Sequence, residues 1–120
     1  MANEITITAI MKLENGHLSI SEVASSKKFD QSALGGGLPG FATIGTTEET
    51  ITTTDISTLG WMWMKNLDTG NYVEWGFSTG VYGGRVEAGE PALLRLNPGA
   101  TIYMKADTAA VDMRIVILED

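Results

Sequence analysis

Cysteine is absent from this chain of 120 residues, and histidine occurs once, at His17. Without thiols the chain can form neither disulfide bridges nor thiolate metal sites, and one imidazole gives little basis for a zinc site or a histidine acid-base pair. His17 follows an Asn-Gly turn signal, so we interpret it as a solvated turn residue. We therefore expect no metal, no cofactor and no catalytic residue, and we predict that the protein is not an enzyme.

Basic residues and long apolar runs are also scarce. Eight Lys and Arg stand against fifteen Asp and Glu, which gives a formal net charge of −7 at pH 7. A surface of that sign repels phosphate, so we expect no direct binding of nucleic acid. No apolar run is long enough to cross a bilayer, and the first ten residues lack the basic and apolar regions of a secretion signal. We expect no membrane partner.

Two weak patterns for other chemistry remain. A pair of carboxylates can catalyse glycoside hydrolysis, and four that could approach one another are Glu48, Glu49, Asp107 and Asp112. Three oxygen-bearing side chains in one turn give a faint calcium pattern without the closing glutamate: Asn66, Asp68 and Asn71. Acidic residues at strand ends and in turns are ordinarily solvated, so we still expect neither a catalytic carboxylate pair nor a calcium site.

The N-terminal segment is the first strong structural signal. Residues 4–13 alternate between apolar and polar side chains, as a half-buried strand does. Asn15-Gly16 then forms the strongest short hairpin signal, because both central residues of a type I′ turn need a positive φ. A two-residue turn at these positions pairs Leu13 with Leu18, and we expect the second strand to run back from His17.

A polar and then glycine-rich stretch, Ser25 to Gly40, has no sustained period. It is longer than most connections inside a compact domain, so we expect a long exposed loop. Loops of this length often contact a partner, which makes the segment a candidate contact region. Its apolar residues Leu34 and Leu38, with Phe41 directly after it, are candidate interface residues.

A second hairpin is expected from strands 60–65 and 72–77 around the turn at residues 66–71, with Lys65 opposite Tyr72. In that register Trp61, Trp63 and Tyr72 share one face with Glu74. The other face is apolar as well and carries these residues: Met62, Met64, Val73, Trp75 and Phe77.

A strand that is apolar on both faces is usually covered on both faces, by a loop, a neighbouring subunit or a ligand. With Tyr82, the aromatic residues Trp61, Trp63 and Tyr72 are therefore candidate interface residues. Exposed aromatic side chains on a β-sandwich can also stack on sugar rings, so a glycan remains an alternative to a protein partner.

The rest of the chain continues the β pattern. Turn signals arrive every eight to twelve residues, and no segment has the period of an amphipathic helix. We predict one all-β domain over residues 1–120, an antiparallel β-sandwich of about eight to ten short strands with a jelly-roll or related Greek-key topology. In the last strand four residues should face inward: Val111, Met113, Ile115 and Ile117.

Several short motifs resemble small β-sandwich virion proteins of tailed bacteriophages, which decorate or cement the capsid or sit at the tail. The resemblance covers roughly residues 44–119. The motifs that carry it are Ile44-Gly-Thr-Thr-Glu-Glu49, Lys65-Asn-Leu-Asp68, Asn71-Tyr-Val-Glu74, Ala88-Gly-Glu90, Leu94-Arg-Leu96 and Lys105-Ala-Asp-Thr-Ala-Ala-Val111.

The resemblance implies a role in binding and assembly. The leading hypothesis is a capsid decoration or cement protein that forms a homo-oligomer, binds the major capsid protein or other virion proteins and stabilises the shell. Its location would be the virion, assembled in the host cytoplasm. A tail, neck or fibre-base component is one alternative. A carbohydrate-binding module that uses Trp61, Trp63 and Tyr72 is another.

Overall fold

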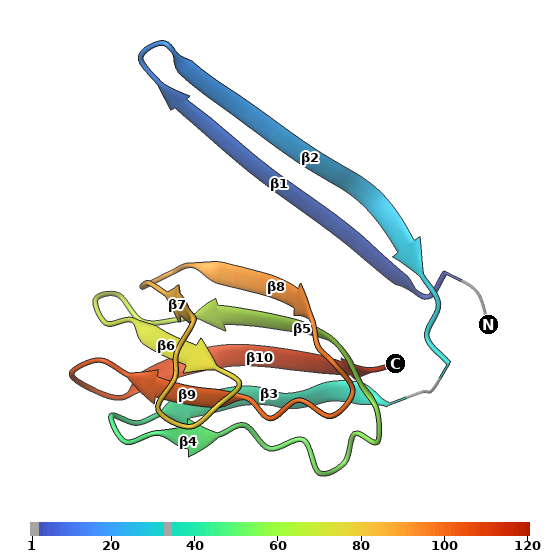
Figure 1. The fold of residues 1–120 in the computed structure, drawn as a ribbon, viewed down its shortest axis with the longest axis vertical. Coiled ribbons are helices and arrows are strands. Elements are labelled where there is room, and N and C mark those ends of the chain that lie inside the picture. The colour runs from blue at the N-terminus through green and yellow to red at the C-terminus, as the bar shows by residue number, and fades with distance from the viewer. Residues whose placement is uncertain (1–2, 33–34) are drawn as a thin grey trace. The chain divides into compact units, whose positions relative to one another are not determined.

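The computed structural model describes residues 3–32 and 35–120 (Figure 1). The regular secondary structure of these residues consists of β-strands, with no helix. The strands are β1 (Ile5–Asn15), β2 (Leu18–Phe29), β3 (Gly36–Ile44), β4 (Glu49–Thr50), β5 (Leu59–Asn66), β6 (Val73–Gly76), β7 (Gly84–Val86), β8 (Pro91–Arg95), β9 (Tyr103–Ala106) and β10 (Val111–Glu119). All pairs of neighbouring strands run antiparallel. The expected all-β class is confirmed.

The chain divides into two compact units, residues 1–33 and 34–120. The first holds the β1–β2 hairpin, and the second holds the other eight strands. Because the hairpin contributes no strand to the sheets of the second unit, the expectation of a single sandwich domain over residues 1–120 stays a prediction. No helix in the described ranges is long and apolar enough to cross a membrane.

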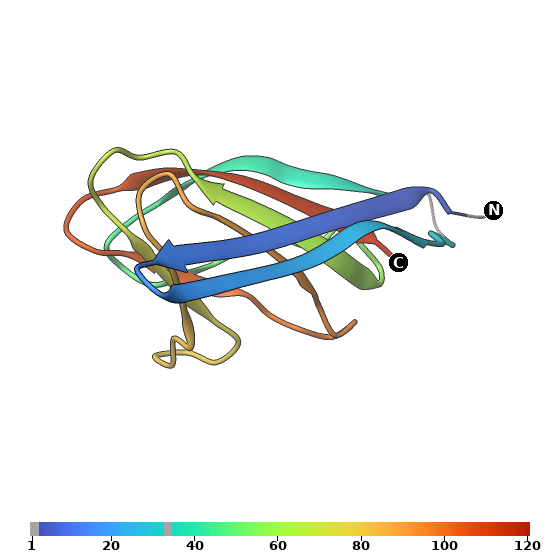
Figure 2. The same cartoon turned by 90° about the horizontal axis from the view of Figure 1, so that it is seen from above.

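The second unit is a sandwich of two four-stranded sheets, ordered β3-β10-β5-β8 and β4-β9-β6-β7. Each of the connections β3–β4, β4–β5 and β5–β6 leads from one sheet to the other, and the last strand, β10, lies between β3 and β5. This is the strand order of a jelly roll. Figure 2 shows the strands of this unit from a second side. The jelly-roll prediction is thus confirmed.

The core lies between the two sheets and is built from alternate residues of each strand. Met62 and Met64 of β5 are fully buried, as are Met104 of β9 and Val73 of β6. The four residues predicted to face inward from β10 are also fully buried. Alternation therefore places Trp61 and Trp63 on the outer side of their sheet, as the sequence predicts.

The predicted hairpin of residues 60–77 is wrong. β5 pairs with β8 and β10, whereas β6 pairs with β7 and β9 in the other sheet. Residues 67–72 are therefore a crossover between the layers, and Lys65 is not opposite Tyr72. The apolar residues of both strands still face a common interior, because Met62 and Val73 meet the same core from opposite layers.

The crossover is held by Asn66, the one polar residue that is fully buried in the described part of the chain. Its amide Nδ2 donates to the carbonyls of Asn71 and Val86, at 2.9 and 3.1 Å, and its Oδ1 accepts the N–H of Asp68 at 2.8 Å. These bonds satisfy backbone groups that leave the β-ladder at the layer change. A hairpin turn would not need them.

The predicted long loop of Ser25 to Gly40 is wrong in extent. β2 continues to Phe29 and β3 begins at Gly36, so only residues 30–35 connect them. Gly36, Gly37 and Gly40 belong to β3, where the backbone pairs with β10 although the side chains show no period. Register with β10, rather than side-chain pattern, makes this glycine-rich segment a strand.

The hairpin unit forms as predicted but with its turn one residue later. Asn15 pairs with Leu18 and Leu13 pairs with Ile20, so Gly16-His17 is the two-residue loop. Gly16 has φ +60°, which suits the first central position of a type II′ turn; a type I′ turn would require a positive φ at the second position too. The odd-numbered residues of β1 keep the common face predicted for them.

Candidate functional site

The outward side of the β3-β10-β5-β8 sheet is the candidate functional site, and we call it the outer face. Its residues alternate with side chains that pack into the core. They include Pro39, Phe41, Thr43, Trp61, Trp63, Lys65, Pro91, Leu93, Arg95, Asp112, Arg114 and Val116. The face brings together Phe41, Trp61 and Trp63, three of the interface residues that the sequence predicts.

A continuous apolar row crosses all four strands of this face. Val116 of β10 lies between Pro39 of β3 and Trp63 of β5, and Trp63 lies opposite Leu93 of β8. Trp63 is 39% exposed, while Val116 and Leu93 are half-buried. Cross-strand neighbours lie about 5 Å apart, so the four side chains form one strip.

Cationic side chains flank the apolar row. The guanidinium of Arg114 lies 4.6 Å from the ring centre of Phe41, and that of Arg95 lies 5.9 Å from the ring centre of Trp61. Arg95 also forms an ion pair with Asp120, with an N–O distance of 2.7 Å. An apolar centre with aromatic residues and arginine at its edge matches the composition of protein interfaces.

The outward side of the β4-β9-β6-β7 sheet differs from the outer face. There Glu74 lies between Lys105 and Arg85, so opposite charges pair across three strands. Such alternation is what a solvated face requires. The outward side of this sheet therefore carries a row of paired charges where the outer face carries an apolar row.

Two predicted site residues lie away from Trp61 and Trp63. Tyr72 sits in the crossover before β6, and its ring stacks under Arg85 at 3.9 Å. Desolvation, followed by the nearby charge of Asp107, raises the pKa of the Tyr72 hydroxyl. The predicted set of Trp61, Trp63 and Tyr72 on one face is thus wrong, because Tyr72 lies in the crossover that leads to the other sheet.

Tyr82 takes part in a different arrangement, a clamp around Glu48. The Glu48 carboxylate accepts hydrogen bonds from the hydroxyls of Thr79 and Tyr82, both at 2.5 Å, and from the N–H of Gly80 at 2.6 Å. The clamp ties the β3–β4 connection to the turn at residues 78–81. The donors lower the pKa of Glu48, with Thr79 first, and the bond to Glu48 raises the pKa of Tyr82 to about 12.

This clamp predicts an acid-dependent contribution to stability. The folded pKa of Glu48 is below the ordinary value of 4.5, so its contribution is present above pH 4.5 and is lost as the pH falls through the folded pKa. We expect Glu48→Gln to lower the melting temperature by a few degrees at pH 7, and the difference from wild type to shrink below pH 4.5. Thermal melts of both proteins between pH 3 and pH 7 measure this difference in melting temperature. Glu14→Gln, at the exposed hairpin tip, is the control, and an equal effect of both substitutions at pH 7 would contradict the clamp.

The remaining predicted interface residues come from the start of the second unit. Leu38 is 37% exposed at the beginning of β3 and pairs with Ile117. Phe41, on the same strand, is 68% exposed and is the most exposed large apolar residue of the outer face. Leu34 lies outside the described residues.

Several residues of the outer face are not among the interface residues that the sequence predicts. Val116, Leu93 and Pro39 complete the apolar row, and Arg114 covers Phe41. Val116 and Arg114 could have been found as the outward partners of the inward residues predicted in β10. Pro39 and Leu93 could not, since the pairing of β3 with β10 and of β8 with β5 joins distant segments.

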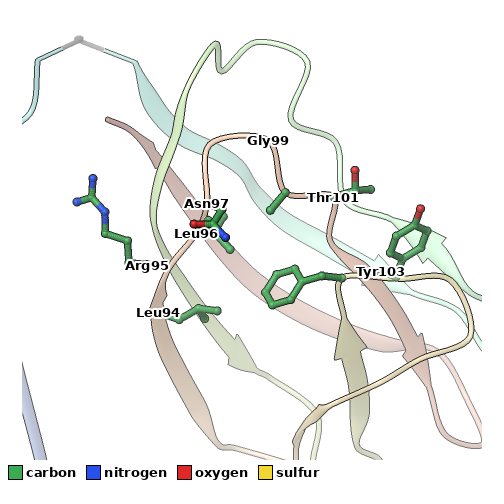
Figure 3. A pocket seen from close by; sticks show the side chains of 9 residues that line it. Leu94, Arg95, Leu96, Asn97, Gly99, Thr101 and Tyr103 are labelled. Carbon is green, nitrogen blue, oxygen red and sulfur yellow. The ribbon is translucent and has the colours of Figure 1, made fainter.

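A pocket of about 530 Å³ lies beside the β8–β9 connection (Figure 3). Its lining residues are Phe77, Leu94, Arg95, Leu96, Asn97, Gly99, Ala100, Thr101 and Tyr103. In Figure 3 the Arg95 side chain points away from the other labelled residues, consistent with its contacts to Trp61 and Asp120. The pocket holds neutral polar groups from Asn97, Thr101 and Tyr103, without a carboxylate to pair with them for acid-base chemistry.

The carboxylates singled out in the sequence take part in local contacts. Asp112 accepts the hydroxyl of Thr43 at 2.7 Å, and Glu49 accepts the N–H of Gly45 at 3.1 Å. Asp68 accepts the N–H groups of Asn71 and Gly70, which lower its pKa, and these two bonds close the turn in which it lies. Within residues 3–32 and 35–120, no group of three or more His, Asp or Glu is arranged to hold a metal ion.

No protein-family model, no curated protein and no solved structure matches this chain. The fold and the outer face therefore carry the functional argument.

Proposed function

We propose that this chain is a non-enzymatic virion structural protein of a tailed bacteriophage, a capsid decoration or cement protein that binds the shell of the major capsid protein and stabilises it. The observation that carries the proposal is the apolar row of the outer face. The resemblance of residues 44–119 to small phage virion proteins supplies the kind of partner.

The physical case rests on the contrast between the two outward sides of the sandwich. Exposed apolar area favours association by roughly 25 cal/mol per Å² removed from water. Trp63 and Phe41 offer large, rigid side chains of the type that dominates binding energy at interfaces. The paired charges around Glu74 offer no such gain. Contact with the shell is therefore expected through the outer face.

Charge supports a protein partner of acidic character. The chain has a net charge of −7, yet three of its eight basic residues, Lys65, Arg95 and Arg114, lie on the outer face with one acidic residue, Asp112; Arg95 is also paired with Asp120. These basic groups surround the apolar row and would meet acidic or aromatic groups of the shell. Charges at the edge of an interface favour correct orientation and fast association.

The alternatives differ in what the outer face would contact. A tail, neck or fibre-base protein would use the same face against another virion protein. A carbohydrate-binding module would retain only Trp61 and Trp63 of its three proposed stacking residues, because Tyr72 lies in the crossover to the other sheet. The apolar row between β3 and β8 favours a protein surface over a sugar ring.

The test is sedimentation of the recombinant protein with phage shells that lack it. We expect wild type to pellet with the shells and to raise their melting temperature. Trp63→Glu, which places a charge in the middle of the apolar row, should reduce binding at least tenfold, whereas Thr50→Glu on the other sheet should leave it unchanged. If wild type binds tail structures or a glycan array but no shell, the corresponding alternative replaces the proposal.

A further inference from the structure

The β1–β2 hairpin has one mainly apolar side, which we call the hairpin face; on the opposite side the exposed pair Ile10 and Val23 stands among Thr, Lys, Ser and Glu residues. Pairing in the ladder puts alternate residues of both strands on this side. Its members are Ile5, Ile7, Ala9, Met11, Leu13, Asn15, Leu18, Ile20, Glu22, Ala24, Lys27 and Phe29. A bulge at Ser25 and Ser26, where Ser26 has φ +51° and its N–H bonds to the Thr8 hydroxyl at 3.0 Å, brings Lys27 onto this side.

Large apolar side chains of the hairpin face are open to solvent. Met11 is 65% exposed and Leu18 52%, and Leu13 and Ile20 are exposed as well. A two-stranded hairpin without further cover is at best marginally stable in water. Two strands of 11 and 12 residues with an exposed apolar side therefore need a partner surface that stabilises their pairing.

Two charges of opposite sign interrupt the hairpin face. Glu22 lies opposite Met11, and Lys27 lies opposite Ile7. Between these two rungs lies the pair Ala9 and Ala24, the smallest side chains on the face. Neither Glu22 nor Lys27 takes part in the ion pairs recorded for the described residues.

This pattern is complementary to itself when two copies stack in antiparallel orientation. In this arrangement the twofold axis runs between the two stacked hairpins, parallel to the Ala9–Ala24 rung and directly over it. It places β2 of one copy over β2 of the other, with the strand direction reversed. Glu22 then meets Lys27 of the other copy, twice by symmetry, as an isologous contact requires. Met11 meets Ile7, and Ile20 reaches Phe29.

Other stackings of the same face leave charges against apolar groups. A twofold axis along the strands would set Glu22 over Met11 of the second copy. An axis shifted to the Met11–Glu22 rung would set Glu22 against Glu22. Burying an unpaired charge or two like charges is costly, so the charge pattern selects the rung with the two alanines.

We propose that a second copy of this chain covers the hairpin face, with the two hairpins stacked antiparallel about the Ala9–Ala24 rung. A hairpin of this length presents a side about 34 Å long and about 10 Å wide, so two stacked copies bury on the order of 700 to 1,000 Å². That area is below the roughly 1,200 to 2,000 Å² of stable specific interfaces and in the range of weak contacts, so a dimer that dissociates on dilution is expected. The inference does not rest on the proposed function, since the hairpin face and the outer face share no residue.

The first test is the mass of the full chain in solution by light scattering at several concentrations. Wild type should approach twice its 12.8 kDa mass as concentration rises. Glu22→Lys and Lys27→Glu, each alone, should weaken the dimer at least tenfold by placing like charges together. The double variant with both substitutions should restore it. Trp63→Glu, on the outer face, should leave the dimer intact.

The second test uses the absence of cysteine from the chain. Ala24→Cys places one thiol opposite its symmetry mate across the roughly 10 Å between stacked sheets, which is too far for a direct disulfide, so a short bis-maleimide should link the two copies. Ser21→Cys, on the opposite side of the same strand, is the matched control and should stay monomeric on a denaturing gel. This readout identifies the face even if a charge variant alters the hairpin itself.

The outcomes separate clearly. Restoration by the double charge variant together with cross-linking from Ala24→Cys alone supports the antiparallel stacking. A wild-type chain that stays monomeric at high concentration overturns the proposal, as does equal cross-linking from Ala24→Cys and Ser21→Cys. Loss of shell binding with an intact dimer would contradict only the proposed function.

Discussion

Replacing Asn66 with alanine is expected to destabilise the sandwich by about 3 to 5 kcal/mol, a fall in melting temperature of roughly 10 to 20 °C. The side chain is fully buried and makes three hydrogen bonds to backbone groups of the crossover. Alanine would leave the carbonyls of Asn71 and Val86 and the N–H of Asp68 without that partner. Each unsatisfied buried group costs about 1 to 3 kcal/mol.

Thermal and urea unfolding of Asn66→Ala measure this effect. Asn97→Ala is the matched control, because Asn97 is exposed in the turn where its carbonyl accepts the N–H of Ala100 at 3.0 Å. The control should change the free energy of unfolding by less than about 0.5 kcal/mol. If both substitutions have the same small effect, the crossover does not depend on Asn66.

Replacing Ile115 with alanine should cost about 2 to 5 kcal/mol of stability, because it leaves a cavity between the two sheets. Ile115 is fully buried in the middle of β10, where it lies between Met64 of β5 and Gly40 of β3. Neighbouring strands fix the backbone on both sides, so the core cannot readily close around the lost atoms.

The next residue on the same strand gives the contrast. Val116→Ala removes a half-buried side chain on the outer face and should cost about 1 kcal/mol or less. It should nevertheless weaken shell binding, whereas Ile115→Ala should weaken binding only as far as it unfolds the protein. Urea melts and sedimentation with shells separate the two effects. Equal losses of stability from both substitutions would contradict the assigned faces of β10.

Local pattern was sufficient to predict the strands and the direction of many side chains. The alternation in β10 predicts its buried residues, and that in β5 separates Met62 and Met64 from the outward tryptophans. Turn spacing, together with the lack of a helical period, predicts the β-sandwich, and the jelly-roll order is the one that the structure has.

Pairing between distant segments could not be predicted in the same way. The sequence of residues 60–77 predicts a hairpin, because both strand segments have clear β patterns and the residues between them favour a turn. The two strands nevertheless belong to different sheets. The signal for the crossover is the burial of Asn66, which depends on Val86 and Asn71 and is not visible in local pattern. For this reason local pattern alone places Tyr72 with Trp61 and Trp63.

The glycine residues of β3 also made this strand difficult to predict from the sequence. Gly36, Gly37 and Gly40 have positive φ values, and a run of such residues usually indicates a loop. Here they pair with β10, and the close approach that they permit is shown by Gly36, where an added Cβ would lie 3.1 Å from the Leu118 backbone. The turn of the first hairpin shifted because Gly16 alone provides the positive φ.

The outer face is the surface that we propose meets the shell. Hydroxyl-radical footprinting, with residue-level mass spectrometry of free and shell-bound protein, tests this claim directly. We predict that Trp63 and Phe41 become protected on the shell, while Tyr103 on the other sheet keeps its reactivity. Protection of Tyr103 with unchanged reactivity of Trp63 and Phe41 would contradict the claim and assign binding to the opposite side of the sandwich.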